Sequence, residues 1–529
     1  MWVLLSIILA LGGFFRVWGT NHVPPELFGD EVDVGYQSYS LLKTGRDIYN
    51  QLLPTYIRSL SESRAPLLMY ATVPTVAALG LNEWGVRLPP VIFGIVSILA
   101  LAMLAYTTTR SRTVAVFSAA CLAFMPWHIQ YSRAGFEVTL LLTLIILGST
   151  LYLRKRQVLA CIFFALTVYT YSTAVVFVPL LILGLWILTR PKILSWGLAV
   201  FIVLLLPFLY QTLRGQTGNR FSQISLISGT NILDDITNGR IAHPGLVGRI
   251  LYNRPAQYLS IFTRNYFQTF STEFLFLRGD PVYRHSVQIV GELLPVTAVF
   301  LLIGVAVAFK KKEWFWLLWL FLAPVASALT VDGGYHATRN FLLVVPLAVL
   351  VAMGIRDLKN HKIILVVLLG VFVMQFTNFY YYYQSDYPKK SWRWWAVGYQ
   401  DTFTALDKIS PSYSRVFINN TYEPSLIRFL FWTKYDPAKF HKEFTLDQPT
   451  KNIVTNYDGF SLDGKYFFGN FAKTDWTNTL LPNSLYLISQ RENVPGDWDW
   501  RVSPPGNISV LHTSVNPYNQ PVFYLITKK

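Results

Sequence analysis

The sequence is poor in charge. Only 14% of its 529 residues are Asp, Glu, Lys or Arg, whereas 53% are hydrophobic, and a typical soluble chain carries about 25% charged residues. A soluble protein of this length would divide into several domains, each with a charged surface. Repeated apolar runs of about 15–20 residues predict membrane-spanning helices instead. The composition therefore argues against an ordinary soluble protein and predicts a polytopic membrane protein.

Cysteine is nearly absent, and acidic residues are outnumbered by basic ones. Cys121 and Cys161 both lie inside apolar runs, so the chain has no disulfide framework of the secreted type. The net charge is +16, and many of the basic residues lie in short connections between the apolar runs. The first run, "MWVLLSIILALGGFFRVWGT", lacks a basic start and a small-residue cleavage site. We interpret it as a retained first span rather than a removed signal peptide.

The apolar runs predict about eleven transmembrane helices: 1–18, 88–109, 113–127, 138–153, 157–171, 173–189, 193–210, 290–309, 314–329, 339–355 and 363–380. Five short connections between them hold thirteen Lys and Arg residues against two acids, Glu313 and Asp357. These connections are 110–112, 154–156, 190–192, 310–313 and 356–362. The positive-inside rule places all five in the cytoplasm. The basic balance is therefore interpreted as orientation in the plasma membrane, and no nucleic-acid partner is expected.

A further apolar run, 66–81, decides the predicted topology. If it crossed the membrane, either the basic turns would alternate sides or the first long loop would be cytoplasmic. As a helix lying at the outer interface, it leaves a cytoplasmic N-terminus and an extracytoplasmic C-terminus. Arg16, near the outer end of the first span, is a mild exception to the rule. The outer face then carries loop 19–87, turn 128–137, loop 211–289, turn 330–338 and the tail 381–529.

The tail differs from the rest of the chain. It is polar, and strand-like runs such as "RVFINN", "SLYLISQ" and "PVFYLIT" alternate with Pro, Gly, Asn and Asp. It predicts an extracytoplasmic soluble α/β domain over 381–529, after a transmembrane catalytic domain over 1–380. The tail is entered through "FYYYYQSDYPKKSWRWW", whose aromatic residues are typical of a membrane-interface belt.

Polar residues gather at the outer ends of several predicted spans. Ionisable groups at this depth are costly unless they are paired or line a wet cavity. Taken singly, an arginine beside a span is most often an interface anchor, and a carboxylate in a long loop is most often solvated. The groups are Asp30, Glu31 and Asp33; Arg64; His128, Arg133 and Glu137; Glu273, Arg278, Asp280, Arg284 and His285; and Asp332, His336 and Arg339.

The joint pattern favours chemistry. Acids and arginines recur on the outer side, while the cytoplasmic turns are almost free of acids. A carboxylate can deprotonate a hydroxyl, and guanidinium groups can hold a phosphate leaving group and its developing charge. A phosphate held at the outer leaflet indicates a lipid-phosphate donor whose tail stays in the bilayer.

Several motifs together carry a resemblance to a known family. An acidic pair follows the first span, then come "SRAPLLMY" and "GLNEWGVRLPPVIFG", with "YSRAGFE", "FLFLRGDPVYRH" and "GYHATRNF" further on. In this order the chain resembles the glycosyltransferase C superfamily, in its protein O-mannosyltransferase and aminoarabinose transferase branch (family 39 and relatives). "RAPL" stands where that branch has a basic residue followed by Pro-Pro-Leu. The likeness covers about residues 1–355 and is most specific over 1–140.

The resemblance implies transfer of a sugar, with inversion, from a polyprenyl-phosphate donor to an extracytoplasmic acceptor. The family's first-loop acid falls on Asp30 as general base, with Glu31 as its partner or the alternative base, and Asp33 is expected at the surface. Arg64 takes the position of the family's basic phosphate ligand, and Glu137 that of the second-loop acid, where aspartate is commoner. Further predicted donor-phosphate contacts are Arg133, Arg339 and His336.

The remaining predictions are less specific. Glu273, Arg278, Asp280, Arg284 and His285 are outer-loop candidates without an assigned role. The resemblance implies no required cofactor, and since the sequence shows no dense ligand cluster, a divalent metal is the disfavoured alternative. The sugar and the acceptor, whether glycan, lipid or protein, stay open.

Two other functions fit a bundle with charged loops. A transporter or flippase of lipid-linked sugars would also place charges among helices, but such proteins often show repeated halves and polar residues at the midplane. The outer loops and tail have no counterpart in a second half. A scaffold protein whose tail is the working module is the other alternative, because fold alone does not exclude it.

Overall fold

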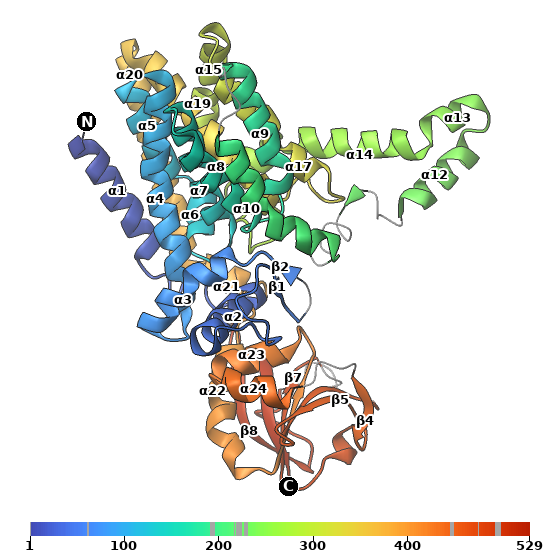
Figure 1. Cartoon of the computed structure of the whole chain (residues 1–529). Helices are drawn as coiled ribbons and strands as arrows, with labels where there is room; N and C mark the ends of the chain where they lie inside the picture. The colour runs from blue at the N-terminus through green and yellow to red at the C-terminus, as the bar shows by residue number, and fades with distance from the viewer. Residues whose placement is uncertain are drawn as a thin grey trace.

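The computed structural model describes residues 2–60, 63–190, 196–215, 217, 225–226, 231–444, 449–473, 476–491 and 499–529. A helical bundle forms one end of the molecule, and a sheet domain forms the other (Figure 1). Residues 191–192 of the third basic connection lie outside the described residues, as do residues 216, 218–224 and 227–230 of the outer loop 211–289.

The bundle is built from apolar helices packed side by side. Among the largest are α1 (Trp2–Val17), α4 (Glu83–Thr109), α5 (Arg112–Ala123), α7 (Val138–Leu153), α8 (Gln157–Val168), α9 (Ala174–Thr189), α10 (Trp196–Leu213), α15 (Thr297–Lys310), α16 (Trp314–Leu322), α19 (Val344–Asp357) and α20 (Lys362–Ser385). Short helices continue some of them: α6 (Pro126–Ser132), α17 (Val325–Ala328) and α18 (Ala337–Asn340).

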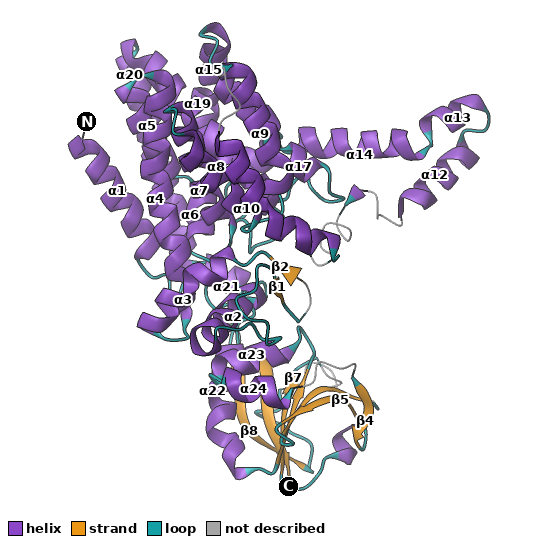
Figure 2. Ribbon diagram, in the orientation of Figure 1, coloured by secondary structure: helices purple, strands orange, loops and turns teal. Residues whose placement is uncertain are grey.

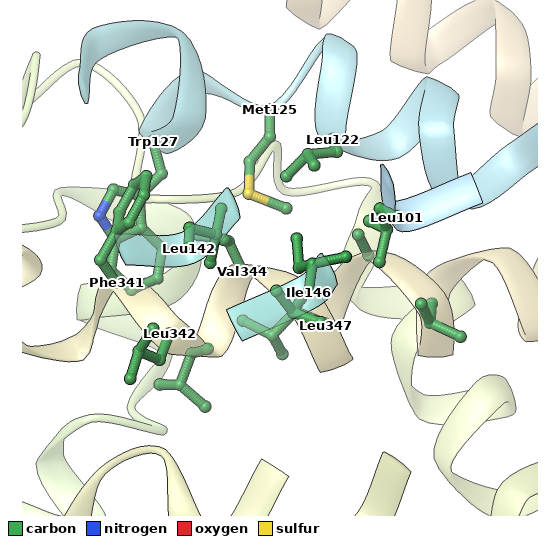
Figure 3. Packing of buried hydrophobic residues seen from close by; sticks show 14 of the residues in the cluster. Leu101, Leu122, Met125, Trp127, Leu142, Ile146, Phe341, Leu342, Val344 and Leu347 are labelled. Carbon is green, nitrogen blue, oxygen red and sulfur yellow. The ribbon is translucent and has the colours of Figure 1, made fainter. Parts of the chain in front are cut away.

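The interior of the bundle is closely packed. α7 and α19 are buried along most of their length, and their leucine, isoleucine and valine side chains meet those of α4 and α5. Figure 3 shows Leu101, Leu142 and Leu347 in this packing, with Trp127 beside Phe341. Within a membrane, close van der Waals packing of such side chains stabilises the contact between helices. This core holds the outer ends of the helices, and therefore the candidate site, in place.

The structure supports membrane helices without establishing their number. Of the described helices, α4, α10, α18–α19 and α20 are long and apolar enough to cross a membrane, and the pair α5–α6 is bent by 61°. Seven further apolar helices have 10–17 residues. The eleven-span topology and its orientation therefore stay predictions.

The first outer loop folds into its own small unit. Its helix α2 (Gly29–Thr44) packs on α3 (Leu67–Leu79), and two short strands, β1 (Ile57–Arg58) and β2 (Ser63–Arg64), pair antiparallel between them. The helix expected over 66–81 is thus confirmed, although its place relative to a membrane is not tested. α3 ends before Gly80, and Asn82 then caps α4 by accepting the N–H of Gly85 at 2.9 Å.

The second outer loop forms an arm that reaches away from the bundle (Figure 1). It consists of α12 (Asn231–Ala242), α13 (Leu246–Leu251) and α14 (Arg254–Gln268). One turn of π-helix (Glu273–Leu277) then leads back to the bundle. Leu246, Val247 and Leu259 are among the arm's exposed apolar side chains.

The C-terminal part contains the predicted α/β domain. Its mixed sheet has the order β4-β5-β6-β3-β7-β9-β8, and β3 lies parallel to both β6 and β7 (Figure 2). The strands are β3 (Arg415–Asn419), β4 (Thr450–Val454), β5 (Tyr457–Leu462), β6 (Tyr466–Phe471), β7 (Ser484–Ser489), β8 (Ile508–Val515) and β9 (Pro521–Lys528). The three strand-like runs of the tail therefore correspond to β3, β7 and β9.

Each face of this sheet is apolar because alternate side chains point to opposite sides. On one face Val416, Ile418 and Leu487 pack toward α22 (Tyr399–Ile409) and α23 (Ser425–Trp432), and this cluster includes Val32 and Tyr36 of α2. On the other face Phe417 and Tyr486 pack with Trp476 and Trp500. α24 (Pro437–Glu443) also contacts α2. The sheet domain is therefore joined to the first outer loop through one continuous core.

Candidate active site

Asp30 and Arg64 form the centre of the candidate site. Asp30 lies in the first turn of α2, and Arg64 ends the short strand β2. An Arg64 Nη2–H donates to Asp30 Oδ1 at 2.5 Å. The Asp30 side chain is 40% exposed, whereas that of Arg64 is 5% exposed. The pair therefore presents an accessible carboxylate held by a buried guanidinium.

Two further carboxylates surround the same guanidinium. Asp33 Oδ2 lies 3.6 Å from Arg64 Nε, and Glu137 Oε1 lies 4.0 Å from Arg64 Nη1. Glu137 immediately precedes α7. The structure thus brings together three residues that lie in separate segments spread over more than 100 positions of the sequence: Asp30, Arg64 and Glu137. Three carboxylates around one guanidinium leave a local excess of negative charge, so binding of an anionic substrate would require further cations.

The expected surface position of Asp33 is wrong. Its residue is only 3% exposed, because the inner face of α2 packs under the hairpin that carries Arg64. Gln37 donates to Asp33 Oδ1 at 3.4 Å. Burial raises the pKa of Asp33 to about 6, while the charge of Arg64 and a hydrogen bond from Ser59 act in the opposite direction. Asp33 therefore titrates near neutrality at the back of the site.

Glu31 occupies a different environment from Asp30. Its carboxylate accepts two bonds from Arg87, at 2.8 Å from Nε and 3.0 Å from Nη2, and both side chains are fully buried. The N–H of Gly135 donates to the same carboxylate at 2.8 Å. A Cβ on Gly135 would lie 2.9 Å from Glu31 Cγ, so the approach requires glycine. Glu31 thus links α2, α4 and the turn before α7.

Arg87 was not singled out from the sequence as a site residue. Its remaining donors bind the main-chain carbonyls of Thr20, Pro24 and Glu26, each at 2.8 Å. The available signal is its motif "RLPP", a charge at the start of the longest apolar helix, which requires a buried partner. Arg87 organises the first outer loop around the acids.

Arg133 also lies inside the protein. Its guanidinium donates to the carbonyls of Phe15, Trp18 and Val23 at 2.7–2.8 Å and stacks on the ring of Tyr383. These contacts fasten the end of α1. Its predicted role in phosphate binding is not tested, and the observed contacts are those of a structural residue.

A second polar cluster forms beside the first. Asp280, His285 and His336 offer ligand atoms that all lie within 4.8 Å of one another, although the sequence indicated no dense cluster. His285 Nδ1 lies 3.0 Å from Asp280 Oδ2, and the Ala337 N–H donates to the same oxygen at 2.9 Å. Burial disfavours the Asp280 charge, but His285, His336 and the Ala337 N–H together hold its pKa below the usual value.

This triad could hold a divalent cation, because two imidazoles and a carboxylate suit zinc and similar metals. The Asp280 carboxylate is satisfied by protein donors as it stands. The three residues could thus bind a metal, and the Asp280 carboxylate also has protein hydrogen-bond donors without one.

The other predicted residues have partners of their own. Arg339 binds Asp332 and donates to Thr330 Oγ1 at 2.8 Å. Glu273 and Arg278 form an exposed ion pair at 3.2 Å. Arg284 contacts the first acidic loop, because its guanidinium lies 4.4 Å from the ring centre of Phe28, two residues before Asp30.

Comparisons with known proteins give a family match and similar solved structures. Residues 63–211, which include Arg64, Arg87 and Glu137, match the family described as dolichyl-phosphate-mannose-protein mannosyltransferase. The crystal structure of ArnT from Cupriavidus metallidurans bound to undecaprenyl phosphate is similar, with 14% identity, a TM-score of 0.51, and coverage of 99% of this chain and 97% of that one. No curated protein matches the sequence.

The segment 63–211 is thus similar to this mannosyltransferase family, and the whole chain shares its fold with ArnT. A second similar structure is the oligosaccharyltransferase of Archaeoglobus fulgidus in complex with Zn and sulfate, at 14% identity and a TM-score of 0.51. The alignment covers 81% of this chain but only 61% of the archaeal protein, so the chain spans about three fifths of that relative. At these identities the structural likeness establishes the fold.

Proposed function

We propose that this protein is a glycosyltransferase that moves a monosaccharide from a polyprenyl phosphate to a hydroxyl on an extracytoplasmic acceptor, with inversion at the anomeric carbon. The observation that carries the proposal is the contact of the accessible Asp30 carboxylate with buried Arg64. The lipids named for similar structures, undecaprenyl phosphate for ArnT and dolichol phosphate for the archaeal oligosaccharyltransferase, support the donor class.

Asp30 is the general base in this scheme. Its carboxylate takes the proton of the acceptor hydroxyl as that oxygen attacks the anomeric carbon. The bond from the anomeric carbon to the phosphate oxygen breaks, and the electron pair leaves on the lipid phosphate. Attack from the side opposite the leaving group inverts the configuration. A positioned base of this kind contributes about 10²–10⁴-fold to the rate.

Arg64 orients Asp30 and adds positive charge beside the leaving phosphate. Because three carboxylates already face Arg64, a second cation is required to balance the phosphate. Arg284 is the preferred partner, since it stacks on Phe28 at the start of the acidic loop. Glu31 then acts through position, holding α2 against α4, rather than by contact with the acceptor.

The test is transfer of radiolabelled sugar in membranes supplied with a panel of polyprenyl-phosphate sugars and an envelope extract as acceptor. Asp30→Asn is expected to lower transfer by about 10²–10⁴-fold while expression and folding are retained. Asp357→Asn, an exposed acid on another segment, serves as the matched control and should transfer normally. Full activity of Asp30→Asn would remove Asp30 from the base role. Movement of the lipid-linked sugar across the membrane without transfer would support the flippase alternative.

A further inference from the structure

A polar groove of about 690 Å³ lies between the sheet domain and the outer loops. One wall comes from the segment before α22, which includes Trp392 and Trp394, and from Arg284 of the second outer loop. The other wall comes from the ends of strands in the sheet domain and their connections, including Tyr422 and Arg491. The groove therefore exists only where the two parts of the molecule meet.

Three arginines lining the groove are stacked on aromatic rings. The guanidinium carbon lies 4.4 Å from the ring centre of Phe28 for Arg284, 5.2 Å from that of Trp392 for Arg393, and 5.2 Å from that of Tyr422 for Arg491. Within the part of the chain that the structure describes, none of these three arginines forms an ion pair. Arg284 also donates its Nε–H to the carbonyl of Trp394 at 3.1 Å. Stacking fixes each guanidinium while its other N–H groups stay available to an anion.

Both acids in the described part of the groove lining are already paired. Glu423 accepts from Arg428 at 2.6 Å, and Asp499 accepts from Arg501 at 2.5 Å. Their charges are therefore balanced by arginines other than the three stacked ones. The charge that the lining offers to a bound molecule is positive, so the groove is complementary to an anion.

The groove also offers the features of a carbohydrate site. Trp394 is 41% exposed and Tyr422 is 39% exposed, so flat aromatic surfaces face solvent. Gln490, Asn519 and Gln520 add amide groups to the same lining, and such groups donate to and accept from hydroxyls. Aromatic surfaces with amides and arginines suit a chain of sugar rings that carries acidic substituents.

The groove opens beside the start of α2. The Glu423 carboxylate lies 2.9 Å from the position of a Cβ on Gly29, the residue before Asp30. Arg284 joins the two regions, because it lines the groove and also covers Phe28. A polymer bound along the groove would thus have one end close to the accessible carboxylate of Asp30.

We infer that this groove binds the acceptor and that the acceptor is an acidic carbohydrate chain, with its anionic groups on Arg393 and Arg491, while Arg284 at the inner end of the groove faces the donor phosphate. The inference rests on the proposed function, since it names the substrate class of the same reaction. It assigns to the sheet domain the task of holding the acceptor while the bundle holds the lipid donor.

The experiment measures binding to the full-length protein in nanodiscs, without donor, by tryptophan fluorescence. The probes are a hexamer of galacturonic acid, a neutral maltohexaose of equal length and a hexa-aspartate peptide. The wild type should bind the uronate about tenfold more tightly than either other probe. Arg491→Gln and Arg393→Gln should each weaken uronate binding about tenfold, the equivalent of one charge-assisted contact. Arg491→Lys should recover part of the loss.

Arg415→Gln is the matched control, because Arg415 is exposed at the opposite end of the sheet from Gln490. It should bind the uronate like the wild type. Equal binding of the three probes, or wild-type binding by both groove variants, would overturn the inference, and preference for the peptide would replace carbohydrate by an acidic protein acceptor.

The role of Asp30 as general base and the role of the groove as acceptor site can be refuted independently of each other. Asp30→Asn should retain uronate binding although it loses transfer. If Asp30→Asn still transfers sugar, the base assignment falls while groove binding stands. If transfer depends on Asp30 but the uronate does not bind, only the groove proposal falls.

Discussion

Adjacent acids on α2 have different environments. Asp30 is part-exposed beside Arg64, Glu31 is enclosed with Arg87, and Asp33 is buried behind Arg64. Successive positions on a helix are rotated by about 100°, so neighbours in sequence point to different surroundings. The chemical role of each acid is therefore a matter of the helix face that it occupies.

Glu31→Gln should destabilise the protein far more than Asp30→Asn. The change leaves Arg87 charged in a fully buried site, which costs about 3–5 kcal/mol, whereas Asp30 has access to water. Thermal unfolding of the two purified variants provides the measurement. If Glu31→Gln unfolds like Asp30→Asn yet loses transfer, Glu31 is a chemical group and the structural interpretation fails.

Asp33 should produce the acid limb of the pH–activity profile. Its pKa of about 6 means that it is ionised above that pH and balances Arg64, and neutral below it. We expect transfer to fall between pH 7 and 5 in the wild type and to change less in Asp33→Asn, as measured in initial rates. If the acid limb of the pH–activity profile is the same in Asp33→Asn as in the wild type, a group other than Asp33 causes it.

The contribution of Asp33 to folding stability changes with pH in the opposite direction to its contribution to transfer activity. Because its folded pKa is raised above the unfolded value, its contribution is greatest at low pH and is lost as the pH rises through about 6. The stability of the wild type relative to Asp33→Asn should therefore fall from pH 5 to pH 7. Thermal unfolding at the two pH values measures this difference.

At the scale of elements, α2 connects the candidate site to the sheet domain. Tyr36 donates to the carbonyl of Tyr435 at 2.8 Å, and Glu26, just before α2, accepts the N–H groups of Gly398 and Gln400 at 2.8 and 2.6 Å. The helix that carries Asp30 is therefore supported from both sides.

Gly35→Ala should loosen this support. A Cβ at Gly35 would lie 2.4 Å from Phe431 of α23 and 2.8 Å from Val86 of α4, so one of the helices must shift. Gly370→Ala in α20 is the matched control, because no atom lies within 4 Å of its added Cβ, and alanine favours a helix by about 1 kcal/mol. Limited proteolysis should release the sheet domain faster from Gly35→Ala only. Equal cleavage of both variants would mean that α23 does not hold α2.

At the scale of the whole molecule, the orientation in the membrane is predicted from charge. The basic turns lie on one predicted side and the sheet domain on the other. The described helices support membrane crossing, but helix packing is the same whichever side faces the cytoplasm. Orientation is therefore a separate prediction.

Cysteine labelling in intact cells tests it. In a chain with Cys121 and Cys161 replaced by alanine, Lys473→Cys in the sheet domain should react with an impermeant maleimide, and Lys311→Cys in a basic turn should react only after permeabilisation. Both positions are exposed. The reverse pattern would invert the topology.

The sequence by itself determined the helical bundle, the α3 helix and the strands of the sheet domain, because apolar runs and alternating patterns are local properties. It also predicted one site with Asp30, Arg64, Glu137 and Arg339, of which the structure shows the first three in contact around Arg64. Only the tertiary structure decided that Asp33 is buried, that Arg87 holds Glu31, and that Asp280 meets His285 and His336. Side-chain burial and pairing depend on segments far apart in the chain, and their positions are set by packing of the whole core.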